Sequence, residues 1–384
     1  MKKFLFLILM FSLMINVQYL FSKGIIINHN HTDITTITQE QVNKVLKNIR
    51  VGYQHTSHGS QLTSGMLALA EYNKMFSVPY STNGFVYDVF FNDYAMPETP
   101  DLGTKGNIAF ANTTIKEMGN KSNNRNVIMW SWCGGVSTND LVGINKYLEA
   151  MSDLEQKFPN VYFVYMTGHL DGTGKDGNLN KMNDIIRQYC IDNDKILFDF
   201  ADIESYAPGI DKNLMELNAN DNCDFDANGD NTLESNWAKL WLIANPNNEL
   251  TKIANSCKTC AHSQLLNCAL KGIATWNLFI QISDKIETNS SIEESNSAES
   301  DDIKIYPNPS NSIFNLSINA NIGASITVDL FDARGNLVKQ LIPNSVQKHN
   351  NASYSFDISN LPVGTYELRA VINGKHLVES FIKN

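Results

Sequence analysis

The chain has 384 residues, of which 43% are hydrophobic and 18% are charged, and its formal net charge is −10. This composition excludes wholesale disorder and allows two or three domains of ordinary size. An excess of 40 Asp and Glu over 30 Lys and Arg argues against nucleic acid or an anionic membrane surface as a partner. Six Cys are too few for a disulfide-built miniprotein but suffice for a few bridges in an oxidising compartment.

Residues 1–22 have the organisation of a secretory signal peptide. Lys2 and Lys3 precede an almost wholly apolar run over residues 4–15, and a weaker stretch ends near Ser22. The run is shorter than the ~20 residues that a spanning helix needs, and no other stretch is apolar enough. We therefore expect a mature protein without a membrane span, exported through the periplasm and outer membrane and either secreted or held at the cell surface.

Residues 24–285 alternate apolar strands with amphipathic helices. Strands are expected at residues 47–53, 126–132, 161–166 and 196–200. Apolar side chains recur every three or four residues from Leu141 to Phe158 and from Leu179 to Tyr189, which predicts two helices. Continuous apolar strands separated by helices are typical of an α/β domain whose parallel sheet is covered on both faces.

Reactive side chains follow these strands. Ligand and catalytic sites in open parallel sheets form beyond the carboxyl ends of the strands, so residues just after each strand are candidates. They are His55, Ser57, His58, Cys133, Gly134, His169, Asp171, Asp199 and Asp202. We expect these groups to share one cleft.

Ser57 is the predicted nucleophile, because it follows the first strand in a tight loop beside Gly59. His262, which precedes an apolar helix, is the predicted base. This arrangement resembles the SGNH (GDSL-like) hydrolases over residues 51–282. The resemblance implies a flavodoxin-like three-layer fold, a serine esterase that needs no cofactor, and a small-molecule or acylated carbohydrate ester as substrate. It also implies oxyanion or substrate contacts from Gly134, Asn139 and His169.

The triad acid is unassigned, because Thr259 stands where these hydrolases carry an Asp three residues before the His. Asp171 or Asp202 is a candidate if the fold brings either near His262. Cys133 is an alternative nucleophile, although in an exported protein we expect it to be buried or bridged. Disulfides are expected among Cys223, Cys257, Cys260 and Cys268, with the pairing open.

Two further functions compete with the serine esterase. His55, His58 and His169 are side chains that zinc prefers, so a metal-dependent hydrolase is one alternative. A non-catalytic surface-binding protein that retains a hydrolase-like fold is the other, because the acid before His262 is missing.

An Asp- and Asn-rich segment predicts a structural calcium loop. Its oxygen-bearing side chains recur at every second position, with Gly229 at the turn, as in the first half of a calcium-binding loop. The predicted ligands are Asp224, Asp226, Asn228 and Asp230.

Residues 286–302 are rich in Ser, Asn and acids and predict a solvated linker. Beyond it, residues 303–384 show period-two alternation and turn sequences, which predict a small immunoglobulin-like β-sandwich. The segments IYPNP at 305–309, VDLFDARGNLV at 328–338 and LPVGTYEL at 361–368 resemble the type A C-terminal sorting domain of the type IX secretion system of Bacteroidota. The resemblance implies recognition by the secretion translocon and no catalysis.

Overall fold

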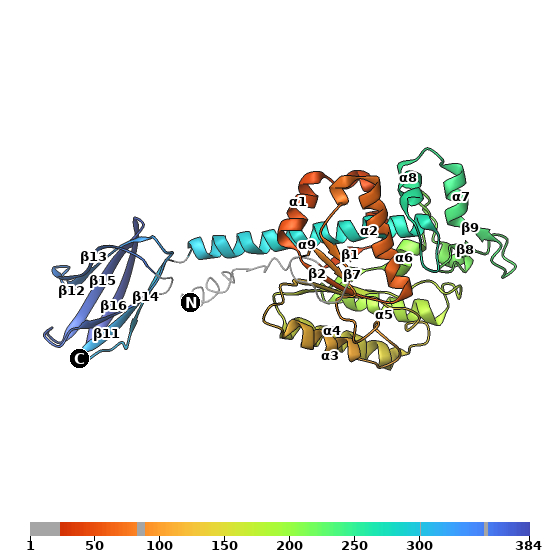
Figure 1. Cartoon of the computed structure of the whole chain (residues 1–384). Coiled ribbons are helices and arrows are strands. Elements are labelled where there is room, and N and C mark those ends of the chain that lie inside the picture. The colour runs from red at the N-terminus through yellow and green to blue at the C-terminus, as the bar shows by residue number, and fades with distance from the viewer. Residues whose placement is uncertain (1–23, 83–88, 300, 349–351) are drawn as a thin grey trace, which may run out of the picture. The chain divides into compact units, whose positions relative to one another are not determined.

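The computed structural model describes residues 24–82, 89–299, 301–348 and 352–384. The predicted signal peptide at residues 1–22 lies outside these ranges. The chain divides into two compact units between Ile286 and Glu287. Figure 1 shows α/β architecture in the first unit and antiparallel β-sheets in the second, which confirms the α/β and all-β classes that the sequence predicts for these two regions.

The first unit is built on a seven-stranded sheet in which every strand pair is parallel. The strand order is β1-β7-β6-β5-β2-β4-β3. Strands β4, β2, β5, β6 and β7 therefore follow the 2-1-3-4-5 order of a doubly wound sheet, whose switch point lies beside β2. The strands are β1 Ile25–Ile27, β2 Val51–Gln54, β3 Tyr80–Ser81, β4 Phe91–Asp93, β5 Val127–Trp130, β6 Tyr162–Met166 and β7 Ile196–Phe198.

Helices cover the two faces of this sheet. Figure 1 shows α3, α4 and α5 on one side and α1, α2 and α9 on the other. The helices are α1 Gln39–Asn48, α2 Ser60–Tyr72, α3 Ala109–Met118, α4 Leu141–Lys157, α5 Asn178–Asp192, α6 Phe200–Glu204, α7 Trp237–Ala244, α8 Glu249–Ser256 and α9 Leu265–Glu299. Shorter elements are η1 His29–His31, η2 Ile34–Thr36, η3 Ser57–Gly59, η4 Lys74–Phe76, η5 Leu214–Leu217, β8 Asp224–Phe225 and β9 Ser235–Asn236.

Helix α4 shows how the sequence sets one of these elements. Asp140 caps it, because its carboxylate accepts the amide hydrogen of Gly143, three residues on. The residues at helical spacing, such as Ile144, Leu148 and Met151, are buried against the sheet. Lys157 ends the helix just before Pro159, which cannot continue it.

Helix α2 and helix α9 approach each other at two glycines. A Cβ atom added to Gly65 would lie 1.9 Å from the carbonyl oxygen of Cys268, and one added to Gly272 would lie 2.3 Å from the carbonyl carbon of Gly65. The two backbones are therefore in direct contact. This contact fixes the start of α9 close to the helix that follows β2.

Helix α9 differs from the expected linker. It continues to Glu299, across most of residues 286–302, where the sequence predicted a solvated segment without regular structure. The first half of α9 is buried through residues such as Ile273, Trp276 and Phe279. Extending an existing helix costs much less than starting one, so a polar continuation rich in Glu, Ser and Asn follows the buried part.

Beyond the end of α9 the second unit is all β, with antiparallel pairing throughout its two sheets. Alternate residues of its strands, such as Phe314, Leu316 and Ile318, form its core. One sheet has the order β10-β11-β14 and the other β13-β12-β15-β16. The strands are β10 Asp302–Tyr306, β11 Ile313–Asn319, β12 Ser325–Asp332, β13 Leu337–Val346, β14 Ala352–Asp357, β15 Gly364–Ile372 and β16 Lys375–Lys383.

Across the described ranges, none of the helices combines the length and the apolarity needed to cross a bilayer.

Candidate active site

Five side chains from distant segments meet at the carboxyl end of the parallel sheet. His58 lies in η3, directly after β2, and Cys133 follows β5. His169 follows β6, Asp221 comes from the segment between η5 and β8, and His262 immediately precedes α9. Because β2 and β5 are adjacent parallel strands beside the switch point, the loops after them open into the same space.

Cys133, His58 and Asp221 form a linear chain of polar contacts. The Cys133 Sγ lies 3.3 Å from Nδ1 of His58, and Nε2 of the same ring lies 2.9 Å from Oδ2 of Asp221. A carboxylate only accepts hydrogen bonds, so Nε2 carries the ring proton of neutral His58. The lone pair on Nδ1 then faces the thiol, which is the arrangement that a base needs to take a proton from sulfur.

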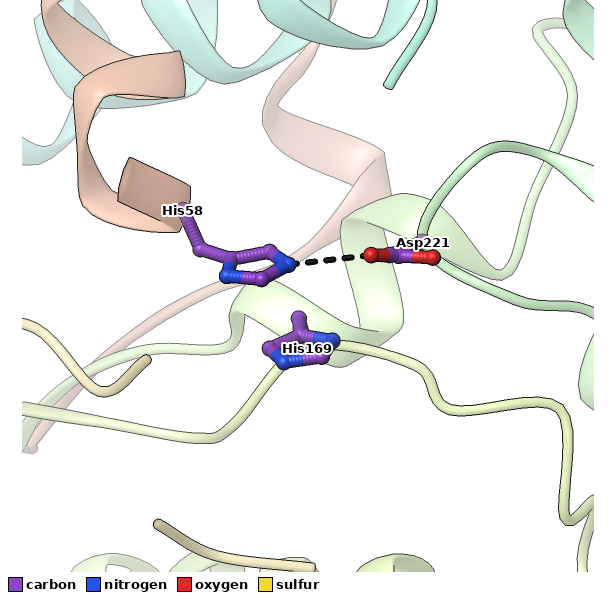
Figure 2. A group of neighbouring side chains, drawn as sticks. All are labelled: His58, His169 and Asp221. Carbon is purple, nitrogen blue, oxygen red and sulfur yellow. Dashed lines mark hydrogen bonds and ion pairs between the residues drawn. The ribbon is translucent and has the colours of Figure 1, made fainter. Parts of the chain in front are cut away.

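His58 also lies inside a stack of three imidazoles. The His169 ring is parallel to it within 1°, with the ring centroids 3.6 Å apart. The His262 ring stacks on His58 at 4.3 Å, with an angle of 13° between the planes. Figure 2 shows the rings of His58 and His169 one over the other, with Asp221 at the edge of His58. The ring of His58 is therefore held in a single plane, which aims its two nitrogens at Cys133 and Asp221.

The surroundings of His58 disfavour its charged form. Burial lowers the pKa of His58 below 6.5, and the neighbouring His169 and His262 lower it further, against an opposing effect of Asp221. At Asp221, burial raises the pKa, but the hydrogen bond from His58 and the nearby His169 outweigh it and bring the pKa below 3.8. At neutral pH the pair is therefore a neutral imidazole beside an ionised carboxylate.

Ser57 lies at the edge of this cluster. Its Oγ is 3.3 Å from Cys133 Sγ, and within the described ranges no hydrogen bond joins Ser57 to His262. His262 itself is exposed, adopts a left-handed backbone with φ of 59°, and contacts His58 through ring stacking. The two residues that the sequence pairs as nucleophile and base thus lie in one cluster, on different sides of the Cys133–His58 contact.

Cys133 contradicts the expectation that it is buried or bridged. It is a free, partly exposed thiol, whereas the other free cysteines, Cys190, Cys223 and Cys257, are buried. Position explains the difference, because Cys133 lies in the loop three residues after the end of β5 and precedes the exposed Gly134.

Among the four cysteines expected to form disulfides, Cys260 pairs with Cys268, eight residues apart. Cys223 and Cys257 remain free. The ring that the bridge closes contains His262, so the disulfide tethers the loop that carries the third imidazole of the stack.

The two oxyanion candidates from the middle of the sheet differ in their surroundings. Gly134 is exposed, and a Cβ added to it would meet no atom within 4 Å. Asn139 is buried at the start of α4, where its Oδ1 accepts the Asp140 amide and no described residue pairs with its Nδ2. No contact links Asn139 to Cys133 or His58 within the described ranges, so Gly134 alone of the two adjoins the cluster.

The remaining sequence candidates are engaged elsewhere. Both ring nitrogens of the buried His55 have partners, Nδ1 at 2.7 Å from the Thr56 carbonyl oxygen and Nε2 at 2.7 Å from Asp93. Asp171 accepts hydrogen bonds from Thr173. Asp202 contacts His29 at 2.5 Å, and Asp199 binds Arg187.

Two groups of side chains have the composition of cation sites. Ligand atoms of His58, His169 and Asp221 all lie within 4.8 Å of one another, so the metal candidates His58 and His169 come together with Asp221 instead of His55.

In the predicted calcium loop, ligand atoms of Asp226, Asp230 and Glu234 likewise lie within 4.8 Å of one another. Asp224 lies apart from them, with its carboxylate accepting hydrogen bonds from Asn222 and Asn236. The Asn228 amide donates to Asp230.

Sequence reasoning missed Asp221. It stands in an Asn- and Asp-rich segment with no preceding strand of the main sheet and 163 positions from His58. No periodicity or spacing marks it, so only the folded chain shows that it is the carboxylate partner of His58.

Comparison with known families identifies one part of the chain. A family model described as the secretion system C-terminal sorting domain matches residues 304–384, which confirms the predicted type IX sorting domain. The protein is therefore exported, to the cell surface or the surroundings, and its tail indicates handling by the type IX machinery.

One similar solved structure covers a short part of the chain. A crystal structure of a DUF3244 family protein with an immunoglobulin-like β-sandwich fold, from Bacteroides vulgatus, is 20% identical, covers 22% of this chain and 100% of its own, and has a TM-score of 0.17. No curated protein matches the chain.

Proposed function

We propose that the α/β unit is an exported ester hydrolase in which Cys133 is the nucleophile, His58 is the base and Asp221 orients His58. One observation carries the proposal: the thiol lies 3.3 Å from Nδ1 of a ring whose Nε2 is bound to a carboxylate at 2.9 Å. A nucleophile, a base and an orienting acid in line are the arrangement that general-base activation of a thiol requires.

The proposed reaction has two steps. Nδ1 of His58 takes the thiol proton, the Cys133 sulfur attacks the carbonyl carbon of an ester, and the carbon–oxygen bond to the alcohol breaks as His58 returns the proton to the leaving oxygen. Water then attacks the thioester, loses a proton to His58, and releases the acid and the free thiol. Asp221 stabilises the imidazolium in both steps by its bond to Nε2.

The amide of Gly134 is the proposed donor to the oxyanion. It makes no hydrogen bond to any residue that the structure describes, and the absence of neighbours around the Gly134 Cα allows an ester oxygen to approach. His169 and His262, whose rings stack on the ring of His58, would contact the substrate. An acylated carbohydrate remains the substrate class that we favour, following the hydrolase resemblance of the sequence.

The SGNH-like assignment is retained as part of this proposal. It is supported by the strand order, by Ser57 directly after β2 and by His262 directly before α9. The proposed site departs from that family in placing the nucleophile after β5, and Ser57, 3.3 Å from the thiol, becomes a neighbour that hydrogen-bonds it.

The test compares two nucleophiles in one assay. Hydrolysis of a panel of p-nitrophenyl esters is measured for the wild type, Cys133→Ala and Ser57→Ala, alongside labelling by iodoacetamide and by a fluorophosphonate. We expect Cys133→Ala to abolish turnover and iodoacetamide to inactivate the wild type. Loss of activity in Ser57→Ala with fluorophosphonate labelling of Ser57, and retained activity in Cys133→Ala, would instead establish the serine esterase. Inactivity across the panel would favour a surface-binding protein.

A metal-dependent hydrolase is a second candidate, favoured by the state of His169. Its Nδ1 lies 2.8 Å from the Leu170 carbonyl oxygen, which only accepts, so the Nε2 of the neutral ring carries a free lone pair. That lone pair, with His58 and Asp221, provides a ligand set suited to zinc. In this case, activity would be removed by a chelator and restored by zinc, and it would survive the Cys133→Ala substitution.

A further inference from the structure

A buried ion pair is connected by hydrogen bonds to the loops that carry the histidine stack. Lys271 on α9 and Glu204 on α6 are fully buried, and Nζ of Lys271 lies 2.5 Å from Oε1 of Glu204. The same ammonium lies 3.6 Å over the Phe200 ring and also donates to Oε1 of Gln61. A charged pair at this depth carries a large desolvation penalty, and removing one partner alone would leave an uncompensated buried charge.

The pair connects to the loop of His169. The second carboxylate oxygen of Glu204 accepts the backbone amide hydrogen of Leu170 at 2.8 Å. Leu170 is the residue after His169, and its carbonyl oxygen binds Nδ1 of that ring at 2.8 Å. Glu204 thereby holds the peptide unit that joins His169 to Leu170.

The loop of His262 is connected on both of its sides. Because Lys271 can only donate, Oε1 of Gln61 faces it and Nε2 of Gln61 donates to the Ala261 carbonyl at 2.6 Å. On the other side, Nδ2 of Asn267 bridges Glu204 at 3.3 Å and Ser263 Oγ at 2.7 Å.

Gln61 also belongs to the first turn of α2, three residues after His58. The network therefore reaches all three segments that carry the stacked rings.

We propose that Lys271 and Glu204 are positioning residues that align His169 and His262 on either side of His58. The proposal rests on the proposed function for its kinetic readout, because the aligned ring is the base for Cys133. The alignment itself can be measured without turnover, by NMR contacts between the stacked histidine rings and by the reactivity of the thiol. A failure of the network is therefore distinguishable from a failure of the proposed chemistry.

The test uses Lys271→Met/Glu204→Gln, which removes both charges together while a glutamine oxygen can still accept the Leu170 amide. We expect a folded protein in which the stack loosens. Ring-to-ring contacts of His58 with His169 and His262, followed by NMR, would weaken, since the loops that carry the outer rings lose their anchor. The rate of Cys133 alkylation by iodoacetamide would change with them, and kcat on an ester that the wild type hydrolyses would fall on the order of 10–100-fold.

Asn267→Ala gives a second reading if the double variant fails to fold. It removes only the bridge between Glu204 and Ser263, together with an Oδ1 that has no partner among the described residues. Thr275→Val is the matched control on α9, since among the described residues its hydroxyl bonds the Lys271 carbonyl within the helix. A folded double variant or Asn267→Ala with unchanged contacts between the rings and an unchanged alkylation rate would overturn the proposal. A change in Thr275→Val as large as theirs would do so too.

Discussion

The imidazoles of His58 and His169 lie face to face, with their centroids 3.6 Å apart and their planes within 1° of parallel. Two imidazolium ions at this distance repel each other, so the stack favours at most one charged ring. His58 is the more buried ring, and the pKa of His58 is lowered by that burial and by His169. The stack therefore keeps His58 neutral at a pH where an isolated histidine is partly protonated.

The pH dependence of turnover follows from this neutrality. Activity that needs neutral His58 as a base should fall as the pH drops through the lowered pKa of His58, so we expect the acid limb below pH 6.5. Asp221→Asn removes a carboxylate that raises the pKa of His58, so the acid limb should move to still lower pH. We expect kcat/KM to fall roughly 100-fold or more in this variant, because the ring proton is no longer held on Nε2.

Asp171→Asn is the control for this series, since Asp171 binds Thr173 and makes no hydrogen bond to a histidine of the described ranges. Initial rates over a pH series give both quantities. An acid limb that stays in place in Asp221→Asn, or a comparable loss in Asp171→Asn, would contradict the assigned role of Asp221.

The disulfide between Cys260 and Cys268 should contribute to stability as well as to the site. Its short ring predicts a stabilisation of about 2.5 kcal/mol. A Cys260→Ser/Cys268→Ser variant should unfold at lower urea concentration and lose the sensitivity of the wild type to a reducing agent. Equal midpoints for the variant and the oxidised wild type would show that the ring carries no such stabilisation.

The close approach of α2 and α9 makes a paired prediction about two glycines. Gly65→Ala forces a Cβ to within 1.9 Å of the Cys268 carbonyl oxygen, so we expect a loss of about 3 kcal/mol in the free energy of unfolding. Gly134→Ala meets no atom within 4 Å and should change that free energy by less than about 0.5 kcal/mol. Urea unfolding of both variants is the measurement, and similar stabilities would contradict the direct backbone contact.

The calcium prediction now rests on Asp226, Asp230 and Glu234. If the loop binds the ion, calcium at about 100 times its dissociation constant would stabilise the unit by about 2.7 kcal/mol. Thermal unfolding in calcium and in a chelator measures this effect, and Asp230→Asn should reduce it. Identical melting temperatures with calcium, magnesium and chelator would refute the prediction.

The sequence predicted the central sheet because its strands are continuous apolar runs between periodic helices. Residues of α4 such as Ile144 and Leu148 occupy the buried face that their spacing indicates. Strands β1, β3 and β4 were not predicted, since each has only two or three residues and, unlike β7, none lies directly after a helix with a clear apolar periodicity.

Only some residues of the candidate site could be predicted from the sequence. Four of its side chains follow parallel strands, and loops at the same end of a parallel sheet converge, so the sequence could predict that they lie together. They are Ser57, His58, Cys133 and His169. The partner of His58 is Asp221, which lies 163 positions away in a polar segment without regular pattern. The expectation for Cys133 was wrong because it used the average behaviour of exported cysteines, while the turn into Gly134 opens this thiol to solvent.

The disulfide between Cys260 and Cys268 also determines the compartment in which the site is completed. Thiols stay reduced in the bacterial cytoplasm, and a chain that carries a sorting domain leaves that compartment. The tether on His262 is therefore completed only on the way out. If the α/β unit is the proposed ester hydrolase, a newly made chain has an incomplete site inside the cell, and oxidation during export completes it.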